Sequence, residues 1–512
     1  MTPVTAGQQA LEETPTAEET RMLVDFRPHA RLSSPTTPVT IDESLGPVVG
    51  ALGESATDLS RVRVVCDWVQ YKQNFRDVVE VRPILSGEPD APVPEGVRDD
   101  DLEVAVDVRR ATTVDLRERT RAVLDARATG DVLLEEWGPT RQSCIWGFNA
   151  LYWSALELWE KATGQAYEQA LPGGESDARN RDAARDVIGE LFAVWDGLAD
   201  RNALPPELYV VEIGVGNGAQ ARVFLDELRA MDVQHGRGYY RRLHYLMCDY
   251  SQHVLDLARE TVADHAEHVS AFVVDACRPR SVLAFLQFRV FLIYISNVYD
   301  NLPTDEVAQL GGRTYLVESR AYLPAADAAE IAASVNARPD QLPGLVATLL
   351  RLGPALLAEA RPDHVPSPDA AVAFWRRVWS AVRLAERYAG LAGLDTYELA
   401  PTVSGEALRP LLESGADVRM HVSNGAVASF TETIGLLHPF GTLVCHDLFA
   451  RDVGAYRTGF RGPGKYDGSV VNWVNGPLLA HIGRRRGFDV SYAPFAHRSG
   501  TNIVTMTAQV RD

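Results

Sequence analysis

The sequence is poor in cysteine and lysine, and it has no excess of positive charge. Its five cysteines are scattered and form no C-x-x-C pair, so the sequence predicts neither a zinc site nor a disulfide framework. We expect buried free thiols in a reducing compartment. The formal net charge is −19, from 50 Lys and Arg against 69 Asp and Glu. No nucleic-acid partner is expected, because binding a phosphate backbone relies on clusters of cationic side chains.

Two targeting features are also missing from the sequence. Residues 1–20 are polar and acidic, without the apolar segment of a secretory signal. No uninterrupted run of about 18 apolar residues predicts a membrane-spanning helix. These absences predict a cytoplasmic protein without a membrane partner. The 512 residues suffice for two or three domains of roughly 150 residues each, and a homodimer is expected on general grounds.

The most informative segment is 210–218, in which an apolar run reaches an acid and three glycines follow at alternate positions. Glycine lets the backbone turn sharply and approach a ligand closely. A helix opening at Ala219 would direct unpaired N–H groups towards that ligand. Glu212, two residues before the first glycine, would repel a pyrophosphate and attract a cation. S-adenosylmethionine (SAM) carries an ammonium and a sulfonium but no phosphate. The segment favours a SAM pocket over a dinucleotide site, which G-x-G-x-x-A also fits, and over a glycine turn without a ligand.

Three further apolar runs end in polar groups, as expected where an open parallel sheet meets its ligand. The run 243–248 leads to Asp249, placed to hold ribose hydroxyls, and the run 271–274 leads to Asp275, placed to reach the amine of adenine. The run 291–295 leads to Ser296. The predicted SAM-binding residues are Glu212, Gly214, Gly216, Asn217, Gly218, Asp249, Tyr250, Asp275, Ala276 and Ser296.

The periodicity along the chain predicts an α/β protein with a Rossmann-like sheet of the class I SAM methyltransferase type. Residues 1–21 should be disordered. The other predicted parts are a small, separate β-rich N-terminal module at 22–110, a helical segment at 111–204, the core at 205–323 and 416–512, and a helical insertion at 324–415. The predicted core strands include 313–318 and 416–423. The insertion should form a lid over the active site, or else a dimerisation or packing element.

Four segments, in this order, resemble the MidA-like methyltransferases, whose mitochondrial member is a complex I assembly factor that methylates a protein arginine. They are the helix 189–195, the glycine motif, the segment 249–255 after a long excursion from Gly218, and Asp300-Asn301-Leu302-Pro303. Weaker similarities lie at 138–140, 445–447 and 467–474. The resemblance covers roughly 135–323 and 416–510. It implies a SAM-dependent enzyme that methylates a guanidino group.

Two departures from the family concern the acceptor. After its fourth strand the family has Asn-Glu-Phe-Phe-Asp, whereas this chain has Ser296-Asn297-Val298-Tyr299-Asp300, so an amide replaces a carboxylate. The family's histidine near the C-terminal motif is replaced by Val471 or Asn472. These changes leave the predicted cofactor residues in place and put the acceptor in question.

Methyl transfer to a guanidinium requires carboxylates that grip its N–H groups and localise electron density on one nitrogen. Asp300, Asp447 and Glu318 are predicted for this task, since each lies at or near a predicted strand end. Their plainer alternatives are a helix cap for Asp300, an ion pair for Asp447 and simple solvation for Glu318. Asn297 and Tyr299 should line the pocket between methyl group and acceptor, or else be hydrogen-bonded core residues.

Two further predictions concern aromatic rings and a histidine. His446 is a candidate proton acceptor. A group of aromatic residues would close over the cofactor or face a cationic substrate, or else belong to the core: Trp146, Phe148, Tyr152 and Trp153.

The predicted acceptor is free L-arginine or a related small guanidino metabolite, which would give an N-omega-methylarginine and S-adenosylhomocysteine. A protein arginine is the second reading, and a non-catalytic SAM-binding assembly factor is the third. A nicotinamide oxidoreductase comes last, because it would have an apolar residue in place of Glu212.

Overall fold

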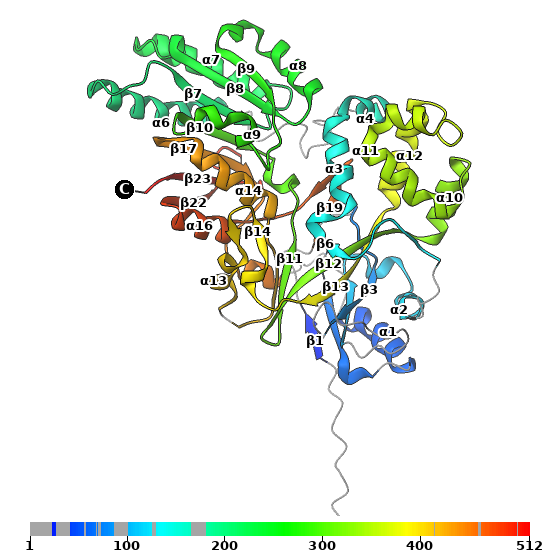
Figure 1. Cartoon of the computed structure of the whole chain (residues 1–512). Helices are drawn as coiled ribbons and strands as arrows, with labels where there is room; N and C mark the ends of the chain where they lie inside the picture. The colour runs from blue at the N-terminus through cyan, green and yellow to red at the C-terminus, as the bar shows by residue number, and fades with distance from the viewer. Residues whose placement is uncertain are drawn as a thin grey trace, which may run out of the picture.

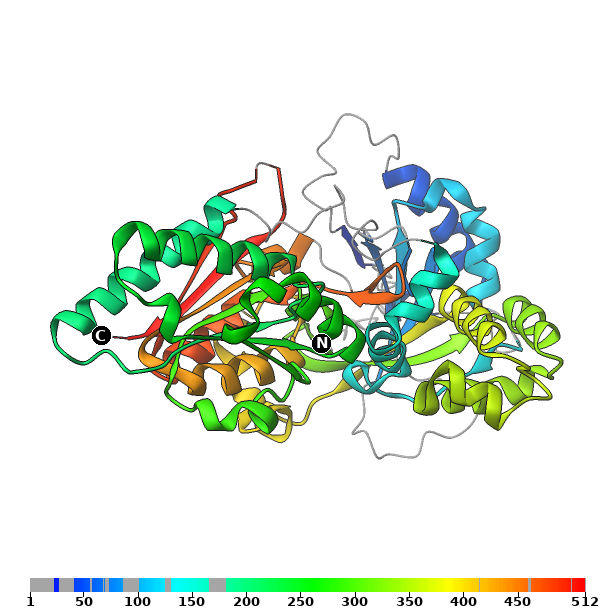
Figure 2. The ribbon, with the colours of Figure 1, turned by 90° about the horizontal axis from the view of Figure 1, so that it is seen from above.

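Two mixed sheets organise the computed structural model of the chain (Figure 1). The structure describes residues 23–26, 41–55, 58–67, 69, 73–85, 101–124, 130–164, 181–413, 415–458, 462–498 and 500–511. The tail predicted at 1–21 lies outside the described residues. Seen from above, the parts built on the two sheets lie side by side (Figure 2).

The first sheet is Rossmann-like and has seven strands in the order β22-β23-β17-β10-β7-β8-β9. Its strands are β7 (Leu208–Ile213), β8 (Leu243–Asp249), β9 (Val269–Val273), β10 (Val290–Ser296), β17 (Leu437–Asp447), β22 (Phe488–Pro494) and β23 (Val504–Val510). Strands β7, β8, β9, β10 and β17 run parallel to one another, whereas β23 is antiparallel to its two neighbours, β17 and β22. The four apolar runs of the sequence thus form adjacent parallel strands. The near-continuous apolar character of β7, β8 and β10 fits their burial on both faces, whereas β9 is an edge strand and is only partly buried.

Helices cover both faces of this sheet. One buried cluster contains side chains from α6 (Arg181–Asp200), α7 (Ala219–His235) and α8 (Gln252–Thr261). Another contains side chains from α9 (Arg280–Leu283), α14 (Asn424–Thr433) and α16 (Gly476–Arg485). Strand order reverses between β7 and β10, because the chain builds outwards from β7 on one side before it crosses to the other. In open α/β sheets such a reversal leaves a crevice at the carboxyl ends of the strands.

The second sheet has ten strands and corrects two predictions. Its main order is β1-β2-β4-β3-β13-β12-β11-β16, with β5 and β6 paired to β12. Its strands are β1 (Leu23–Phe26), β2 (Val62–Asp67), β3 (Val79–Ile84), β4 (Asp101–Asp107), β5 (Val132–Leu133), β6 (Gly138–Pro139), β11 (Glu306–Leu310), β12 (Arg313–Leu323), β13 (Arg383–Gly390) and β16 (Val418–His421).

The strands predicted at 313–318 and 416–423 therefore belong to this sheet and not to the Rossmann-like sheet. The β-rich segment 22–110 is also not a separate module, since its strands continue this sheet through the pairing of β3 with β13. Apolar periodicity identifies a strand but carries no information about its partner, which explains both errors.

Buried ion pairs connect the N-terminal strands to the rest of the second sheet. Arg76 and Arg82 both contact Glu386 on β13, at 2.5 Å and 3.2 Å. Within each part, Arg82 also contacts Glu103 at 2.9 Å and Arg419 contacts Glu386 at 2.8 Å. All five side chains are buried. Breaking such a network by removing one partner leaves an uncompensated charge in the core, which is strongly destabilising.

The insertion contributes three helices to a separate apolar cluster. These are α10 (Ala325–Ser334), α11 (Leu342–Ala360) and α12 (Pro368–Ala381), and they pack with α3 (Cys144–Ser154) and α4 (Leu156–Thr163). Within the described ranges one helical segment, 339–360, is long and apolar enough to cross a membrane by length and composition alone, which the sequence analysis did not expect. Part of its apolar surface, including Leu345 and Leu349, belongs to the cluster that α11 forms with α12 and α3, whereas Leu356 is half-exposed.

Candidate functional site

The glycine turn after β7 depends on backbone conformations that favour glycine. Gly214, Gly216 and Gly218 have φ of 79°, 55° and 80°. A Cβ on Gly214 would come within 2.3 Å of the side chain of Val298, and a Cβ on Gly218 within 2.8 Å of the backbone of Ala258. The turn therefore packs closely against α8 and against the loop after β10 (residues 297–305). A side chain at Gly214 or Gly218 would push these elements apart.

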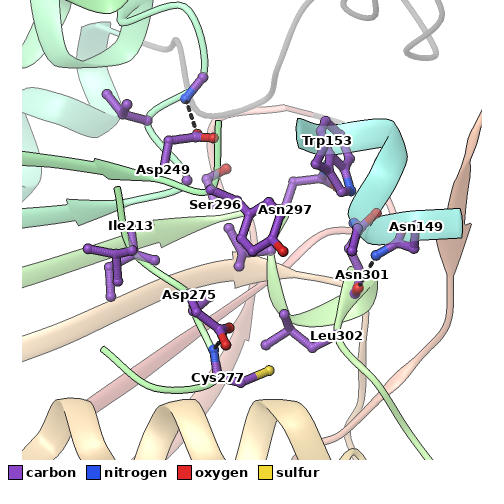
Figure 3. A pocket seen from close by; sticks show the side chains of 18 of the residues that line it. Asn149, Trp153, Ile213, Asp249, Asp275, Cys277, Ser296, Asn297, Asn301 and Leu302 are labelled. Atoms are coloured by element: carbon purple, nitrogen blue, oxygen red, sulfur yellow. Dashed lines mark hydrogen bonds between the residues drawn. The ribbon is translucent and has the colours of Figure 1, made fainter. Parts of the chain in front are cut away.

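A cavity of about 340 Å³ lies at the carboxyl ends of β7, β8, β9 and β10 (Figure 3). Nine of the ten predicted cofactor residues line it: Glu212, Gly214, Gly216, Asn217, Asp249, Tyr250, Asp275, Ala276 and Ser296. The tenth, Gly218, instead packs against α8. The structure thus gathers into one cavity residues from four separate strand ends.

Glu212 is the most buried ionisable group of the lining. Only 2% of it is exposed, and its carboxyl accepts a hydrogen bond of 2.6 Å from the hydroxyl of Tyr245. Burial raises the pKa of Glu212 to about 8, and the charge of Asp249 acts in the same direction. The carboxyl of Glu212 is therefore mostly neutral at pH 7. A cationic ligand beside it would favour its ionised form.

The other two acids of the lining are tied to the turns that carry them. Asp249 accepts hydrogen bonds of 3.1 Å from the backbone N–H of Gly216 and of 3.1 Å from that of Ser251. Burial raises the pKa of Asp249 to about 6. Asp275 accepts a hydrogen bond of 2.9 Å from the N–H of Cys277, which also lines the cavity. Each acid is therefore held in one orientation while part of its acceptor capacity stays available.

One face of α3 closes the opposite side of the cavity. Trp146, Asn149, Ala150 and Trp153 all line it, and their spacing of i, i+3, i+4 and i+7 places them on one helical face. Trp146 and Trp153 were among the predicted aromatic residues. The other two, Phe148 and Tyr152, are buried in the core.

Asn149 and Asn301 also line the cavity, although neither was predicted as a site residue. Asn149 donates a hydrogen bond of 2.9 Å to the backbone oxygen of Asn301 and accepts one of 2.9 Å from Val470. The i, i+3 and i+7 spacing of Trp146, Asn149 and Trp153 along one helix could have identified Asn149. Asn301 stands in the segment Asp300-Asn301-Leu302-Pro303 that carries part of the family resemblance, but only Asp300 of that segment was predicted as a site residue.

Asp300 and Asp447 do not line the cavity, which corrects their prediction as carboxylates that grip the acceptor. Asp300 lies in the loop that follows β10 and Asp447 at the end of β17, and both side chains are buried. Asp447 accepts hydrogen bonds from the backbone N–H groups of Val298 at 3.1 Å and Tyr299 at 2.8 Å. Burial, together with the charge of Asp447, holds the pKa of Asp300 well above its usual range, and burial raises that of Asp447 to about 6. The pair anchors the loop instead of touching a ligand.

Three other predicted catalytic residues also lie outside the lining. Tyr299 belongs to the loop after β10, and its side chain is buried in the core. His446 faces β23, where its Nδ1 lies 2.9 Å from the hydroxyl of Thr505. Glu318 lies on β12 in the second sheet and accepts a hydrogen bond of 2.6 Å from Arg387. Of the six predicted catalytic residues only Asn297 lines the cavity, because a strand end fixes the place of a side chain but not its direction.

The helical insertion does not line this cavity, so α3 takes the place that the sequence analysis gave to a lid. Within the described ranges, no group of three or more His, Cys, Asp or Glu residues is placed to hold a metal ion.

No family model and no curated protein matches the chain. Several solved structures are similar to it. A Burkholderia thailandensis protein bound to S-adenosyl-homocysteine is 14% identical, with 73% of this chain and 88% of that chain covered and a TM-score of 0.43. The DszA carbon methyltransferase is 12% identical, covering 82% and 74%, with a TM-score of 0.32. The [4+2]-cyclase SpnF is 11% identical, covering 73% and 97%, with a TM-score of 0.30. These likenesses concern the fold, and function has to be argued from the site.

Proposed function

We propose that the chain is a SAM-dependent methyltransferase. The observation that carries this proposal is the buried Glu212 directly before the glycine turn, at the point where strand order reverses. A carboxyl there disfavours the pyrophosphate of a dinucleotide and favours a cationic ligand. Asp249 and Asp275 lie at the ends of the next two strands and line the same cavity. The three acids match the ammonium, the ribose hydroxyls and the adenine amine of SAM.

Each acid has a separate task in this proposal. Glu212 holds the ammonium group, Asp249 accepts from the ribose hydroxyls, and Asp275 accepts from the exocyclic amine of adenine. SAM supplies an electrophilic methyl group on sulfonium, so the protein needs little acid–base chemistry of its own for the transfer. The chain's task is to place the acceptor in line with that methyl group and to exclude water, which α3 and the loop after β10 perform from the other side of the cavity.

The acceptor of the methyl group is a separate prediction from the transfer itself. A guanidinium, free or in a protein, was predicted on the strength of Asp300, Asp447 and Glu318, and these carboxylates lie away from the cavity. Free L-arginine, a small guanidino metabolite and a protein arginine stay predictions. The assembly-factor alternative predicts SAM binding without transfer.

A labelled-methyl reaction tests the proposed function. Purified protein is incubated with SAM carrying a ¹³C-labelled methyl group, free L-arginine and a cell lysate, and the products are separated by size. Transfer to any acceptor supports a methyltransferase, with methylarginine in the small-molecule fraction supporting the guanidino metabolite. Label only on macromolecules supports a protein acceptor. Bound SAM without any transfer would refute the enzyme and support the assembly factor.

Two glycine variants control this reaction. Gly214→Ala places a Cβ into the side chain of Val298, whereas the Cβ of Gly236→Ala meets nothing within 4 Å. Both positions have positive φ, 79° and 66°. Backbone strain is therefore common to both variants, and only Gly214→Ala should abolish SAM binding and transfer. Equal losses would mean that the turn matters for folding and not for the cofactor.

A further inference from the structure

The side of the cavity opposite the three acids is built from amides, indoles and apolar groups. The described residues that line it come from α3 and the loop after β10: Trp146, Asn149, Ala150, Trp153, Asn297, Val298, Asn301, Leu302 and Pro303. Figure 3 shows Asn149, Trp153 and Asn301 on one side of Asn297, with Asp249 and Asp275 on the side of the strand ends. Since the acids match the cofactor, this side is where an acceptor meets the methyl group.

Asn297 has an unused side chain at this position. Its backbone is left-handed, with φ of 55°, and its N–H donates a hydrogen bond of 2.9 Å to the backbone oxygen of His446. Its side-chain amide makes no hydrogen bond to the residues that the structure describes, although it lines the cavity. Asparagine tolerates the left-handed region better than most residues, and residues held there cluster at ligand sites. On this side of the cavity the fold thus presents the amide of Asn297 to a ligand with its hydrogen-bonding capacity unused.

The neighbouring amides are already oriented by the protein. The side chain of Asn149 joins the backbone of Asn301 to that of Val470, with both bonds at 2.9 Å. The side-chain NH₂ of Asn301 donates to Asp300 at 2.5 Å. Trp146 uses its indole N–H to donate to the backbone oxygen of Thr140 at 2.9 Å. The wall around Asn297 is therefore preorganised, as a group that must orient a reacting atom needs to be.

Resting on the proposed function, we infer that the acceptor is an uncharged amine nitrogen of a small molecule and that Asn297 orients it. The side-chain oxygen of Asn297 accepts an N–H of the amine and aims the nitrogen lone pair at the methyl group. Two indoles, Trp146 and Trp153, line the same space and stabilise the positive charge that develops on nitrogen. Among the described residues this side of the cavity holds no carboxyl, so desolvation there favours the neutral form of an amine before transfer.

The chemistry explains why amides suffice here. An uncharged amine has a free lone pair, so no base has to remove a proton first. Its nitrogen forms the new N–CH₃ bond as the S–CH₃ bond breaks, and the electron pair of that bond stays on sulfur. The positive charge passes from sulfur to nitrogen, and the methylated ammonium then loses a proton to water. A hydroxyl acceptor would need a base, and a guanidinium would need a carboxylate grip.

Identifying the kind of atom that receives the methyl group tests this inference, even while the acceptor molecule is unidentified. The protein is incubated with ¹³C-methyl SAM and a small-molecule extract of bacterial cells, and the labelled product is analysed by ¹H–¹³C NMR, which distinguishes methyl on nitrogen, oxygen, sulfur and carbon. An N-methyl product on an amine supports the inference. Methyl on oxygen, sulfur, carbon or a guanidino nitrogen would overturn it and leave the proposed methyltransferase intact. No transfer to the extract would overturn the inference, whereas the methyltransferase itself is refuted only if the lysate reaction, which also offers macromolecules, shows no transfer.

Matched variants test the role of Asn297. Asn297→Ala should lower kcat by about a hundredfold to a thousandfold, the range for losing one oriented hydrogen-bonding group. Asn202→Ala is the control, because Asn202 is also exposed and left-handed, with φ of 55°, and does not line the cavity. Calorimetry with S-adenosylhomocysteine should give the same Kd, within about twofold, for both variants and the unaltered protein. Unchanged kcat in Asn297→Ala, or an equal loss in the control, would refute an orienting role.

Discussion

Replacing Glu212 by Gln separates the charge of this residue from its shape. Gln keeps an oxygen that can accept the hydrogen bond from Tyr245, which is 2.6 Å in the native chain. It cannot ionise, so it cannot form an ion pair with the ammonium of SAM. We expect Glu212→Gln to fold and to bind SAM more weakly than the unaltered protein.

The pKa of about 8 gives the magnitude of the effect on binding. Because the cation binds to the ionised carboxylate, SAM binding below this pKa releases one proton. The affinity should therefore rise about eightfold between pH 6.5 and pH 7.5. Asp249, with a pKa of about 6, is largely ionised across this window and adds little. In Glu212→Gln the affinity should change by less than about twofold.

The same pKa predicts an opposite effect on stability without SAM. The pKa is raised from its ordinary 4.5 to about 8, so the folded protein holds a proton that the unfolded chain releases. The contribution of Glu212 is present in full below pH 4.5 and is lost as pH rises through about 8. Linkage gives a loss of about 3 kcal/mol between pH 6 and pH 9, which Glu212→Gln should not show.

Two measurements test the predicted role of the Glu212 charge in SAM binding and in stability. Calorimetry of SAM binding at pH 6.5 and 7.5, in buffers of different ionisation enthalpy, reports both the affinity and the proton released. Urea unfolding of the SAM-free proteins from pH 6 to pH 9 reports the stability difference. The reasoning fails if the unaltered protein binds SAM with the same affinity at both pH values, or if the two proteins lose stability in parallel as pH rises.

Two further predictions concern groups behind the site and in the second sheet. Asp447→Asn should lower the free energy of unfolding by about 1–3 kcal/mol, because a carboxylate that accepts backbone hydrogen bonds is lost. Asp300→Asn should leave the free energy of unfolding nearly unchanged, because it relieves the crowding of two carboxyls. Equal effects of the two substitutions in urea unfolding would contradict these different roles. Arg419→Met should cost about 3–5 kcal/mol, because it leaves two buried glutamates without this partner, and a melting temperature within a few degrees of the unaltered protein would show that the network is dispensable.

The cofactor side of the cavity was largely predictable because its signals are local. An acid followed by alternate glycines dictates a turn in which side chains are excluded, and Gly214 meets that requirement with φ of 79°. Asp249 and Asp275 follow strands that the apolar runs identify, and parallel strands bring their ends to one edge of the sheet. Each prediction needed only the period of a strand and the chemistry of the residue that follows it.

The acceptor side depended on packing between distant segments. Asp300 and Asp447 also follow strands, but their side chains turn away from the cavity, and Asp447 holds the loop that presents Asn297. Likewise the strand at 313–318 is real, yet β12 joins the second sheet. Its partner β13 lies beyond the three helices of the insertion, and sequence periodicity cannot specify a pairing across such a distance.

The sequence by itself determined a Rossmann-like α/β core and nine of the residues that line the cavity at its strand ends, because backbone conformation and strand period act over a few neighbouring positions. Only the tertiary structure decided which carboxyls are buried, which helix covers the cavity and which amide faces it with its side chain unused. Those outcomes depend on packing between segments that are far apart in the sequence, such as α3 and the loop after β10.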